Sequence, residues 1–283
     1  MIDREPLHLT AFSDDPEGGN PAGVVLDARG LSDDELQAVA TELGYSETAF
    51  LYPVADDEAA YAIRYFSPIS EVDFCGHATI AAGVALGREH GDGLFELSSK
   101  VGLIPVDVTV VGKHAVATMT TPAATSEPLD EDVLDALLAA LDWEYDDLDP
   151  RFVPSVAHAG TFHPVLVADS RHRLRELDYD YDDLLELMEE HDWLTIQLVY
   201  PKDGDPHQRT WYSRNPAPTI GMYEDAATGT AAAAFGAFLR DYGIAGSGDH
   251  ITVLQGDDMG RPSSIMVTIG GSHMRVSGTA VDL

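Results

Sequence analysis

Short apolar segments recur along the chain and predict a protein rich in β-strands. They are enriched in Val, Ile and aromatic residues, which suit the pleated and half-buried surface of a sheet. Polar stretches that contain Gly and Pro separate them, as expected for turns. The predicted strands cover residues 21–28, 48–54, 61–67, 104–112, 114–121, 163–170, 195–201, 208–213 and 264–270.

A second pattern, in which apolar residues return every three to four positions, predicts amphipathic helices. The clearest spans 33–43, because Ser32 and Glu35 have the spacing of a capping box, which satisfies the first backbone N–H groups of a helix. The same pattern occurs at about 130–141 and 181–190. Together with the strands, these helices indicate an α+β fold.

Two other helical segments, about 78–88 and 229–241, carry Ala, Gly and large apolar residues on nearly every side. A helix of this kind has no solvent face and is buried all round. In a chain made mostly of strands, the natural place for it is inside a curled sheet. We therefore expect two barrel-like sheets, each wrapped around one central buried helix.

The two halves of the chain repeat the same order of segments. "PAGVVLDARGLSDDELQAVA" is matched by "HPVLVADSRHRLRELDYDYDDLLELM", "TAFLYPV" by "TIQLVYP", and "CGHATIAAGVALG" by "DAATGTAAAAFGAFL". A lag of about 142–149 residues indicates a duplicated domain and not a solenoid of short repeats. We predict two pseudo-symmetric domains, 1–120 and 121–274, with an active site in the cleft between them. The last strand, about 275–283, is a candidate member of the first domain.

The charge balance is strongly acidic. The 283 residues include 49 Asp and Glu against 16 Lys and Arg, which gives a formal net charge of −33. Acidic blocks alternate with apolar segments, so we interpret them as solvated helix faces and loops. At about 1 M salt the Debye length falls to about 3 Å and self-repulsion fades. The composition predicts a protein of a salt-rich, halophilic cytosol, and it argues against nucleic acid or an anionic membrane as partner.

Targeting and disulfide signals are missing from the sequence. The N-terminus "MIDREPLHLT" is polar, without the apolar core of a signal peptide. The longest apolar runs, such as "AAAAFGAFL", span about nine residues, far fewer than the ~20 that a membrane helix needs. A single cysteine excludes an internal disulfide and a four-cysteine zinc site. We expect a cytoplasmic protein that does not bind membranes.

The only cysteine, Cys75, stands two residues before His77 at the start of the first buried helix. A zinc site would need further ligands at a recognisable spacing, which His158 and His163 do not provide. A Cys–His acyl-transfer pair is a further alternative, although no nucleophile-elbow sequence surrounds it. We interpret Cys75 as a small buried apolar residue. His77 is either a functional imidazole that faces the cleft or a hydrogen-bonded structural histidine.

The matching turn of the second half, "EDAATGT", places Asp225 and Thr230 at the start of the second buried helix. Taken alone, Asp225 is equally well explained as a helix cap. Paired with His77 of the other half, it becomes a candidate catalytic carboxylate. Backbone N–H groups near Gly76, Gly229 and Thr230 lie at helix N-termini, where they suit a substrate carboxylate or an oxyanion.

Other polar residues complete the set of candidates. Glu47 in "YSETAFLYP" begins an apolar strand, where burial would raise its pKa toward the range of a general base; the alternative is an ordinary strand-end glutamate. Asn20 in "GGNPAG" marks a turn and is a candidate substrate contact. Arg261 in "LQGDDMGRPS" pairs either with a substrate carboxylate or with a surface acid, and Gln255 receives no role. The sequence contains no GxGxxG after a strand and no P-loop, so nucleotide binding has little support.

These motifs resemble the PhzF family, which comprises the phenazine-biosynthesis isomerase and its relatives. The resemblance rests on "GNPAGVV", "SETAFL", "RYFSPISEVDFCGHAT", "EDAATGTAAAAFGAFL" and "QGDDMGRPS", in this order over nearly the whole chain. It implies the diaminopimelate-epimerase fold, with two pseudo-symmetric domains that are each a barrel-like sheet around a central helix. It also implies a homodimer that uses no cofactor and no metal.

Position by position, the family's catalytic glutamate, histidine and aspartate match Glu47, His77 and Asp225, and its substrate-contacting serine is replaced by Thr230. The resemblance implies an isomerase in which Glu47 removes a proton from a small carboxylated substrate, cyclic or amino-acid-like, and returns it on the same face. A cysteine-pair epimerase is excluded because the second half has no cysteine. Two alternatives stay open: an epimerase or racemase with Glu47 and His77 on opposite faces, and a non-catalytic small-molecule-binding member of the fold.

Overall fold

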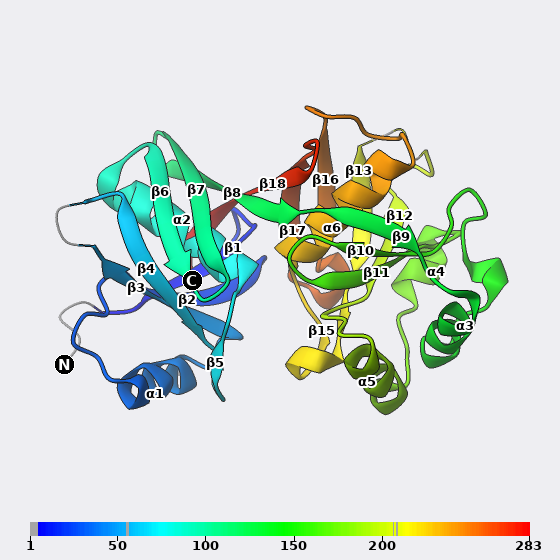
Figure 1. Ribbon diagram of the computed structural model, residues 1–283, viewed down its shortest axis with the longest axis horizontal. Helices are drawn as coiled ribbons and strands as arrows, with labels where there is room; N and C mark the ends of the chain where they lie inside the picture. The colour runs from blue at the N-terminus through cyan, green and yellow to red at the C-terminus, as the bar shows by residue number, and fades with distance from the viewer. Residues whose placement is uncertain (1–4, 55–56, 206, 208) are drawn as a thin grey trace. The chain divides into compact units, whose positions relative to one another are not determined.

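The computed structural model describes residues 5–54, 57–205, 207 and 209–283, and the chain divides into two compact units (Figure 1). The first unit contains Met1–Thr120 and Ser277–Leu283, and the second contains Thr121–Val276. Two expectations fall partly outside the described residues. They concern the polar N-terminus, of which residues 1–4 are not described, and the predicted strand 208–213, of which Gln208 is not described.

The first unit is built from strands and two helices. Its strands are β1 (Leu7–Ala11), β2 (Asn20–Val25), β3 (Glu47–Pro53), β4 (Ala60–Phe66), β5 (Glu71–Val72), β6 (Gly93–Ser99), β7 (Gly102–Val111), most of β8 (His114–Ala123) and the end of β18 (His273–Asp282). Its helices are α1 (Asp33–Leu43) and α2 (Gly76–His90).

Eight strands of the first unit close into a barrel. The hydrogen-bonded order is β1-β2-β3-β4-β6-β7-β8-β18, and β18 returns to β1, where Leu9 lies opposite Asp282 and Ala11 opposite Ala280. The hydroxyls of Thr118 in β8 and Ser277 in β18 lie 2.8 Å apart. Closure thus pairs β1 with β18, two strands that would otherwise be sheet edges and expose backbone groups to other chains.

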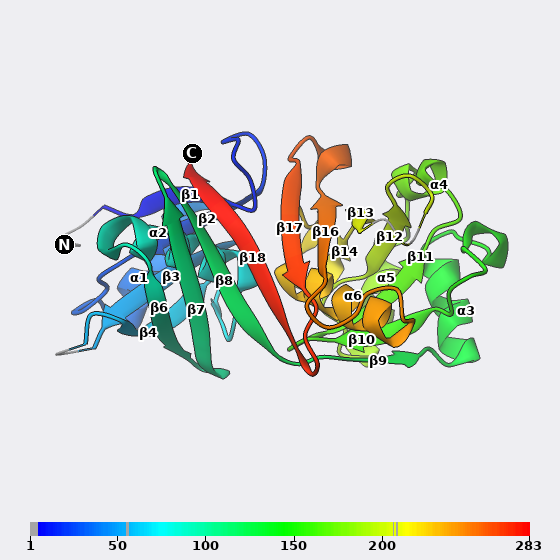
Figure 2. The same cartoon turned by 90° about the horizontal axis from the view of Figure 1, so that it is seen from above.

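Helix α2 fills this barrel (Figures 1 and 2). Every residue from His77 to Gly87 is buried, and α2 contacts β1, β2, β3, β6 and β7. The helix approaches the sheet very closely, because a Cβ at Gly87 would lie 2.4 Å from Val108 Cγ1 and one at Gly83 would lie 2.7 Å from Val106 Cγ1. The absence of side chains at these two positions allows the helix to fit inside the barrel.

Helix α1 covers the outside of the barrel and has the capping box predicted from the sequence. The Ser32 side chain accepts a hydrogen bond from the Glu35 backbone N–H, and the Glu35 carboxylate accepts one from the Ser32 N–H. Its apolar side, with Leu36 and Ala40, joins a buried cluster that includes Phe50 of β3. The predicted helix at 33–43 is therefore confirmed.

The second unit has more helices outside its sheet. Its strands are β9 (Thr125–Pro128), β10 (Ser155–His158), β11 (Phe162–Val167), β12 (Gln197–Pro201), β13 (Thr210–Arg214), β14 (Pro216–Ala217), β15 (Met222–Glu224), β16 (His250–Gln255), β17 (Ser263–Thr268) and the start of β18. Its helices are α3 (Glu131–Ala140), α4 (Arg171–Arg175), α5 (Tyr181–Glu190) and α6 (Gly229–Asp241), with 3-10 turns η1 (Tyr145–Asp147), η2 (Pro218–Ile220) and η3 (Asp257–Met259).

The sheet of the second unit curls around α6. Its strand order is β17-β16-β13-β12-β11-β10-β9, and α6 contacts β17 at one end of this order as well as β9 and β10 at the other. All residues of α6 from Gly229 to Leu239 are buried. Helices α3 and α5 cover the other face through a core that includes Leu137, Leu184 and Trp193.

The two central helices have the ordinary length of helices in globular proteins. The central helix α2 has 15 residues and α6 has 13. Among the residues that the structure describes, no helix has the length and apolar character to cross a membrane.

Candidate active site

Glu47 and His77 meet at the mouth of the first barrel. Glu47 is the first residue of β3, and His77 is the second residue of α2. Their Oε2 and Nε2 atoms lie 3.4 Å apart, and the side chains are 14% and 7% exposed. Two residues separated by 30 positions in the sequence therefore form one acid–base pair that is largely shielded from water.

Two further side chains fix the His77 ring. The Asn20 amide nitrogen lies 3.3 Å from Nδ1, and the Ser46 hydroxyl lies 3.2 Å from Nε2. Both ring nitrogens thus have polar partners, which hold the imidazole in one orientation. Asn20 was predicted as a substrate contact; the structure places its amide on His77.

Cys75 belongs to the same cluster. Its Sγ lies 3.4 Å from Glu47 Oε2 and 3.3 Å from His77 Nδ1, and the residue is buried. The thiol therefore contacts both predicted catalytic residues of this unit. The interpretation of Cys75 as a small apolar core residue was incomplete, because the sequence gives no indication that its sulfur faces a carboxylate.

The N-terminus of α2 presents backbone donors beside this cluster. Within the described chain, the Cys75 side chain makes no capping hydrogen bond to the backbone of α2, and the first helical hydrogen bond runs from Thr79 N to Cys75 O at 3.1 Å. The N–H groups from Gly76 to Ala78 precede that bond. Such groups, at the positive end of a helix dipole, favour an anion.

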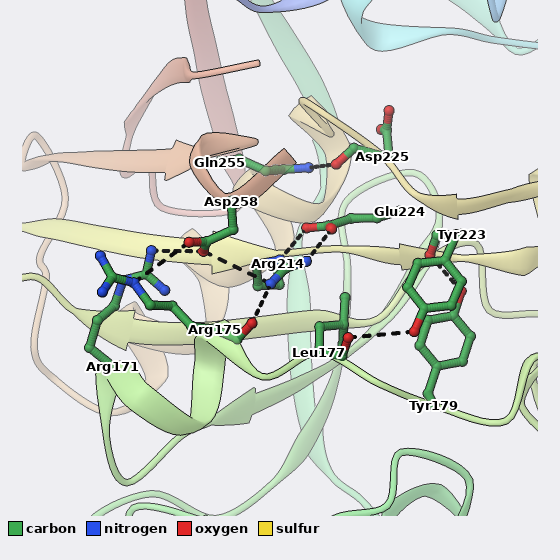
Figure 3. A network of polar contacts seen from close by, with 10 residues as sticks. All are labelled: Arg171, Arg175, Leu177, Tyr179, Arg214, Tyr223, Glu224, Asp225, Gln255 and Asp258. Atoms are coloured by element: carbon green, nitrogen blue, oxygen red, sulfur yellow. Dashed lines mark hydrogen bonds and ion pairs between the residues drawn. The ribbon is translucent and has the colours of Figure 1, made fainter. Parts of the chain in front are cut away.

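In the second unit, Asp225 is held in a network of its own (Figure 3). Its Oδ2 accepts a 2.6 Å hydrogen bond from Thr228 Oγ1, and its backbone carbonyl accepts one of 2.9 Å from Gln255 Nε2. Gln255 is fully buried and also accepts from the Thr228 N–H at 3.2 Å. Gln255, to which the sequence assigned no role, thus positions the turn that carries Asp225.

Glu224, next to Asp225, has a structural partner. Arg214 donates two 2.5 Å hydrogen bonds to the Glu224 carboxylate, and both residues are buried. Burial opposes the charge of Arg214, but the Glu224 carboxylate outweighs it and raises the pKa of the guanidinium. Figure 3 shows the Asp225 side chain pointing away from this ion pair. The two adjacent acids therefore have different environments, and Asp225 is the candidate for substrate binding.

Thr230, the second residue of α6, contacts a histidine that the sequence did not identify as functional. His163 Nε2 lies 3.2 Å from Thr230 Oγ1, while Nδ1 lies 2.9 Å from Thr195 Oγ1. His163 is completely buried, and this burial lowers its pKa to about 3. At neutral pH it is an uncharged ring that orients the Thr230 hydroxyl.

The two units repeat this arrangement. In the first, Asn20 precedes a proline in β2 and contacts His77, the second residue of the central helix. In the second, His163 precedes a proline in β11 and contacts Thr230, again the second residue of the central helix. Asn20 and His163 are therefore equivalent positions of the duplicated fold.

The strand registers then identify the counterpart of Glu47. Two residues after Asn20, Ala22 lies opposite Glu47 in the parallel pair β2–β3. Two residues after His163, Val165 lies opposite Gln197 in the parallel pair β11–β12. The second unit thus has Gln197 where the first has a carboxylate, and a glutamine side chain does not exchange protons at carbon.

Gln197 is a second functional candidate that the sequence did not reveal. It is fully buried, and its Oε1 accepts hydrogen bonds from Asn215 and, at 3.3 Å, from Ser213. Its Nε2 has no hydrogen-bond partner among the described residues. A buried amide donor left unpaired costs stability, so a ligand acceptor is a natural partner for it.

The predicted site residues thus form two sets. The structure brings Asn20, Glu47, Gly76 and His77 together in the first unit. It brings Asp225, Gly229 and Thr230 together at the N-terminus of α6 in the second. Arg261 lies in the loop after η3, where its backbone N–H donates to Gly256 O at 3.0 Å.

Comparison with known proteins shows relatives along the whole chain. A family model described as phenazine biosynthesis-like protein, PhzC-PhzF, matches residues 9–283. The uncharacterized isomerase YfhB of Bacillus subtilis is 30% identical over 297 residues, which cover 99% of this chain and 97% of that protein. The trans-2,3-dihydro-3-hydroxyanthranilate isomerase of Pseudomonas aeruginosa is 31% identical over 275 residues, with coverages of 96% and 93%.

A solved structure agrees with the fold. A Pseudomonas aeruginosa protein described as a predicted epimerase superposes with a TM-score of 0.85 at 26% identity, covering 99% of this chain and 97% of that one. Together with the closed barrel around α2, this confirms the expected α+β fold of the diaminopimelate-epimerase type. The chain belongs to the PhzC-PhzF family of phenazine biosynthesis-like proteins, as its motifs indicated, and is an enzyme of the isomerase class.

Proposed function

We propose that this protein is a cofactor-independent isomerase that moves a proton, and with it a double bond, on a small carboxylated substrate. The observation that carries the proposal is the Glu47–His77 pair, 3.4 Å apart at the N-terminus of α2. Glu47 is the general acid/base. A carboxylate in this position is shielded from water yet keeps an exposed fraction of 14%, so a substrate carbon can reach it.

The reaction needs one base and no external reagent. The Glu47 carboxylate takes a proton from a carbon conjugated with the substrate's unsaturated carboxylate, and the C–H electron pair moves into the conjugated system. The negative charge that develops is favoured by backbone N–H groups at a helix N-terminus. The protonated Glu47 then returns the proton to another carbon on the same face, which regenerates the carboxylate and leaves the double bond shifted.

His77 supports Glu47 in this cycle. Its ring is fixed by Asn20 and Ser46, and its Nε2 faces the Glu47 carboxylate. It holds the carboxylate in place and relays protons to a polar group of the substrate. This role makes His77 a partner of the base on the same side of the substrate.

The geometry disfavours an epimerase that uses Glu47 and His77 on opposite faces of one carbon. Each base would need to lie about 3 Å from the carbon, which requires roughly 6 Å between them. The two groups are 3.4 Å apart. The second unit offers no replacement at the equivalent strand position, because Gln197 stands there. Proton return by Glu47 alone is therefore the mechanism that these residues support best.

We further propose that the set of residues in the second unit binds polar groups of a small carboxylated substrate. Asp225 is a carboxylate suited to an amino or hydroxyl group, and Gln197 Nε2 and the Thr230 hydroxyl suit a carboxylate. The Pseudomonas aeruginosa relative is named for trans-2,3-dihydro-3-hydroxyanthranilate, a cyclic carboxylate that carries an amino and a hydroxyl group. A substrate of this class carries the amino, hydroxyl and carboxylate groups that these residues suit.

A screen of candidate substrates tests the proposal. Cyclic and amino-acid carboxylates, including trans-2,3-dihydro-3-hydroxyanthranilate, are incubated with the enzyme in D2O and molar KCl, and proton NMR follows both the double bond and deuterium incorporation. The expected result is a shifted double bond, with deuterium at the new carbon in the turnovers in which the protonated Glu47 exchanges with solvent before it returns the proton. Deuterium at a stereocentre with loss of optical rotation and no shift would show an epimerase instead. A bound carboxylate that never exchanges a proton would show a non-catalytic binding protein.

A further inference from the structure

Three atoms of different chemistry converge at the N-terminus of α2. Cys75 Sγ lies 3.4 Å from Glu47 Oε2 and 3.8 Å from His77 Nε2, and the last two atoms lie 3.4 Å apart. These atoms all lie within 4.8 Å of one another. Cys75 and His77 are buried, so the cluster is not one of the many exposed acidic groups of this chain.

Two of these separations match those between the ligands of a tetrahedral zinc ion, and the third, 3.8 Å between Cys75 Sγ and His77 Nε2, is slightly longer. Bonds of about 2.3 Å to sulfur and about 2.0–2.2 Å to nitrogen or oxygen place neighbouring ligands about 3.3–3.6 Å apart. The cluster therefore occupies three corners of such a tetrahedron with little rearrangement. We propose that Glu47, Cys75 and His77 form a binding site for Zn²⁺ or a similar thiophilic divalent cation.

The charges of the three groups suit a dication. The Cys75 thiolate and the Glu47 carboxylate together neutralise the two positive charges of the ion, and the His77 imidazole adds a neutral ligand. The Cys75 thiol gives its proton to solvent when the metal binds. Metal on His77 Nε2 requires a proton on Nδ1. Asn20, whose amide nitrogen lies 3.3 Å from that atom, accepts this hydrogen through its oxygen after a flip of the amide.

The sequence predicted no metal at this position, because no spacing pattern was present around Cys75. Glu47 is 28 positions away in the sequence and reaches the thiol only through the barrel fold. Metal binding at this site does not depend on the proposed isomerase activity. The effect of metal binding on activity does rest on the proposed function. An ion held by the Glu47 carboxylate removes the proposed acid/base, so the cation acts as an inhibitor and not as a cofactor.

Cobalt titration of the full-length protein tests the site directly. After treatment with chelator, Co²⁺ is added in molar KCl, which suppresses weak binding to surface acids. We expect a near-ultraviolet thiolate-to-cobalt band that saturates at one equivalent and is displaced by Zn²⁺. C75S abolishes this band, and E47Q and H77N each weaken Co²⁺ binding by about tenfold or more. E42Q, at an exposed position of α1, leaves the binding unchanged.

Two results would overturn the site. One is the absence of the band in folded wild-type protein at one equivalent. The other is unchanged Co²⁺ affinity in E47Q and H77N variants whose circular dichroism is native, which would leave Cys75 as a single ligand. A separate arm measures turnover with Zn²⁺. A metal that binds as described but does not inhibit would count against Glu47 as the acid/base and would leave the metal site itself intact.

Discussion

His163 shows how one buried side chain links stability to the candidate site. It has no exposed surface, and its ring nitrogens contact Thr161 at 2.8 Å, Thr195 at 2.9 Å and Thr230 at 3.2 Å. Hydroxyl groups can donate to or accept from a neutral imidazole, but they do not balance the charge of a protonated ring. Burial therefore lowers the pKa of His163 to about 3, from 6.5 in the unfolded chain.

We expect this histidine to make the protein less stable in mild acid. As the pH falls below about 6.5, the unfolded chain binds a proton at His163, whereas the native state binds it only near pH 3. Between these values the free energy of unfolding therefore decreases by up to about 1.4 kcal/mol for each pH unit. Urea unfolding at several pH values in molar KCl measures this slope. H163Q should show a shallower slope than wild type, and the exposed H172Q variant should not. Parallel slopes in wild type and H163Q would contradict the assignment.

At the residue scale, the sequence predicted some functional side chains and missed others for a physical reason. Glu47 and His77 were each predicted as candidates because they stand at the starts of apolar elements, but their contact was not predicted. The pairing that was predicted, between His77 and Asp225, stays a prediction. Gln197 and His163 were missed because each stands inside an apolar strand, where a polar residue looks like an isolated core position. The register of β11 against β12 identifies Gln197 as the counterpart of Glu47, and the contact with Thr230 links His163 to the central helix.

At the scale of elements, the packing of α2 against the barrel depends on its glycines. In an exposed helix, alanine is favoured over glycine by up to about 1 kcal/mol. At Gly83, however, a Cβ would lie 2.7 Å from Val106 Cγ1 and 2.8 Å from Ala117 Cβ, closer than side chains pack. These neighbours belong to strands β7 and β8 of the barrel wall, and both are fully buried.

We therefore predict that G83A destabilises the protein by about 1–3 kcal/mol, because overpacking outweighs helix propensity. The midpoint of urea unfolding measures the change. The control is A38G on the exposed face of α1, which reports propensity alone and should destabilise by about 1 kcal/mol or less. A G83A variant as stable as wild type would show that the helix and the barrel wall are less tightly packed than described.

Local sequence signals predicted the individual helices correctly, whereas the alignment of the two halves did not predict which strand positions correspond. The capping box fixed the start of α1, and apolar character on all sides identified α2 and α6. The sequence alignment of "TAFLYPV" with "TIQLVYP" was wrong by three positions, since the registers pair Glu47 with Gln197. A slip of an odd number of residues moves a side chain to the other face of a sheet, and only strand pairing reveals it. The strand β6 (Gly93–Ser99) was not predicted, because its glycine and serine ends resemble turns.

At the scale of the whole molecule, acidic side chains far outnumber their possible partners. With 49 acidic and 16 basic residues, at least 33 acids have no base of their own. The few bases are shared: Arg64 contacts both Asp33 at 2.6 Å and Glu71 at 2.8 Å. The remaining repulsion between carboxylates opposes folding in dilute buffer.

We therefore predict that KCl stabilises the protein, with most of the gain between about 0.05 and 1 M, where the Debye length falls from more than 10 Å to about 3 Å. The unfolding temperature measured over this range checks the prediction. A neutral osmolyte such as sucrose is the control, because it does not screen charge. A stability that stays constant or falls with KCl would argue against adaptation to a salt-rich cytosol.

The duplicated architecture was the part of the fold that the sequence predicted best, because two all-round apolar helices in matched order leave few other arrangements. The closed barrel around α2 and the family relationship confirm this fold class. The homodimer and the shared cleft stay predictions. Both depend on surfaces, where a single sequence carries little information about which residues make contact.

The central claim is that Glu47 is the acid/base at carbon, and solvent deuterium incorporation into an accepted substrate tests it most directly. In E47Q the amide cannot take or return the proton, so incorporation should fall by about 10²–10⁴-fold while the fold and the unfolding transition stay close to wild type. The matched E42Q variant, at an exposed position of α1, should incorporate deuterium at the wild-type rate. Wild-type incorporation by a folded E47Q variant would contradict the account.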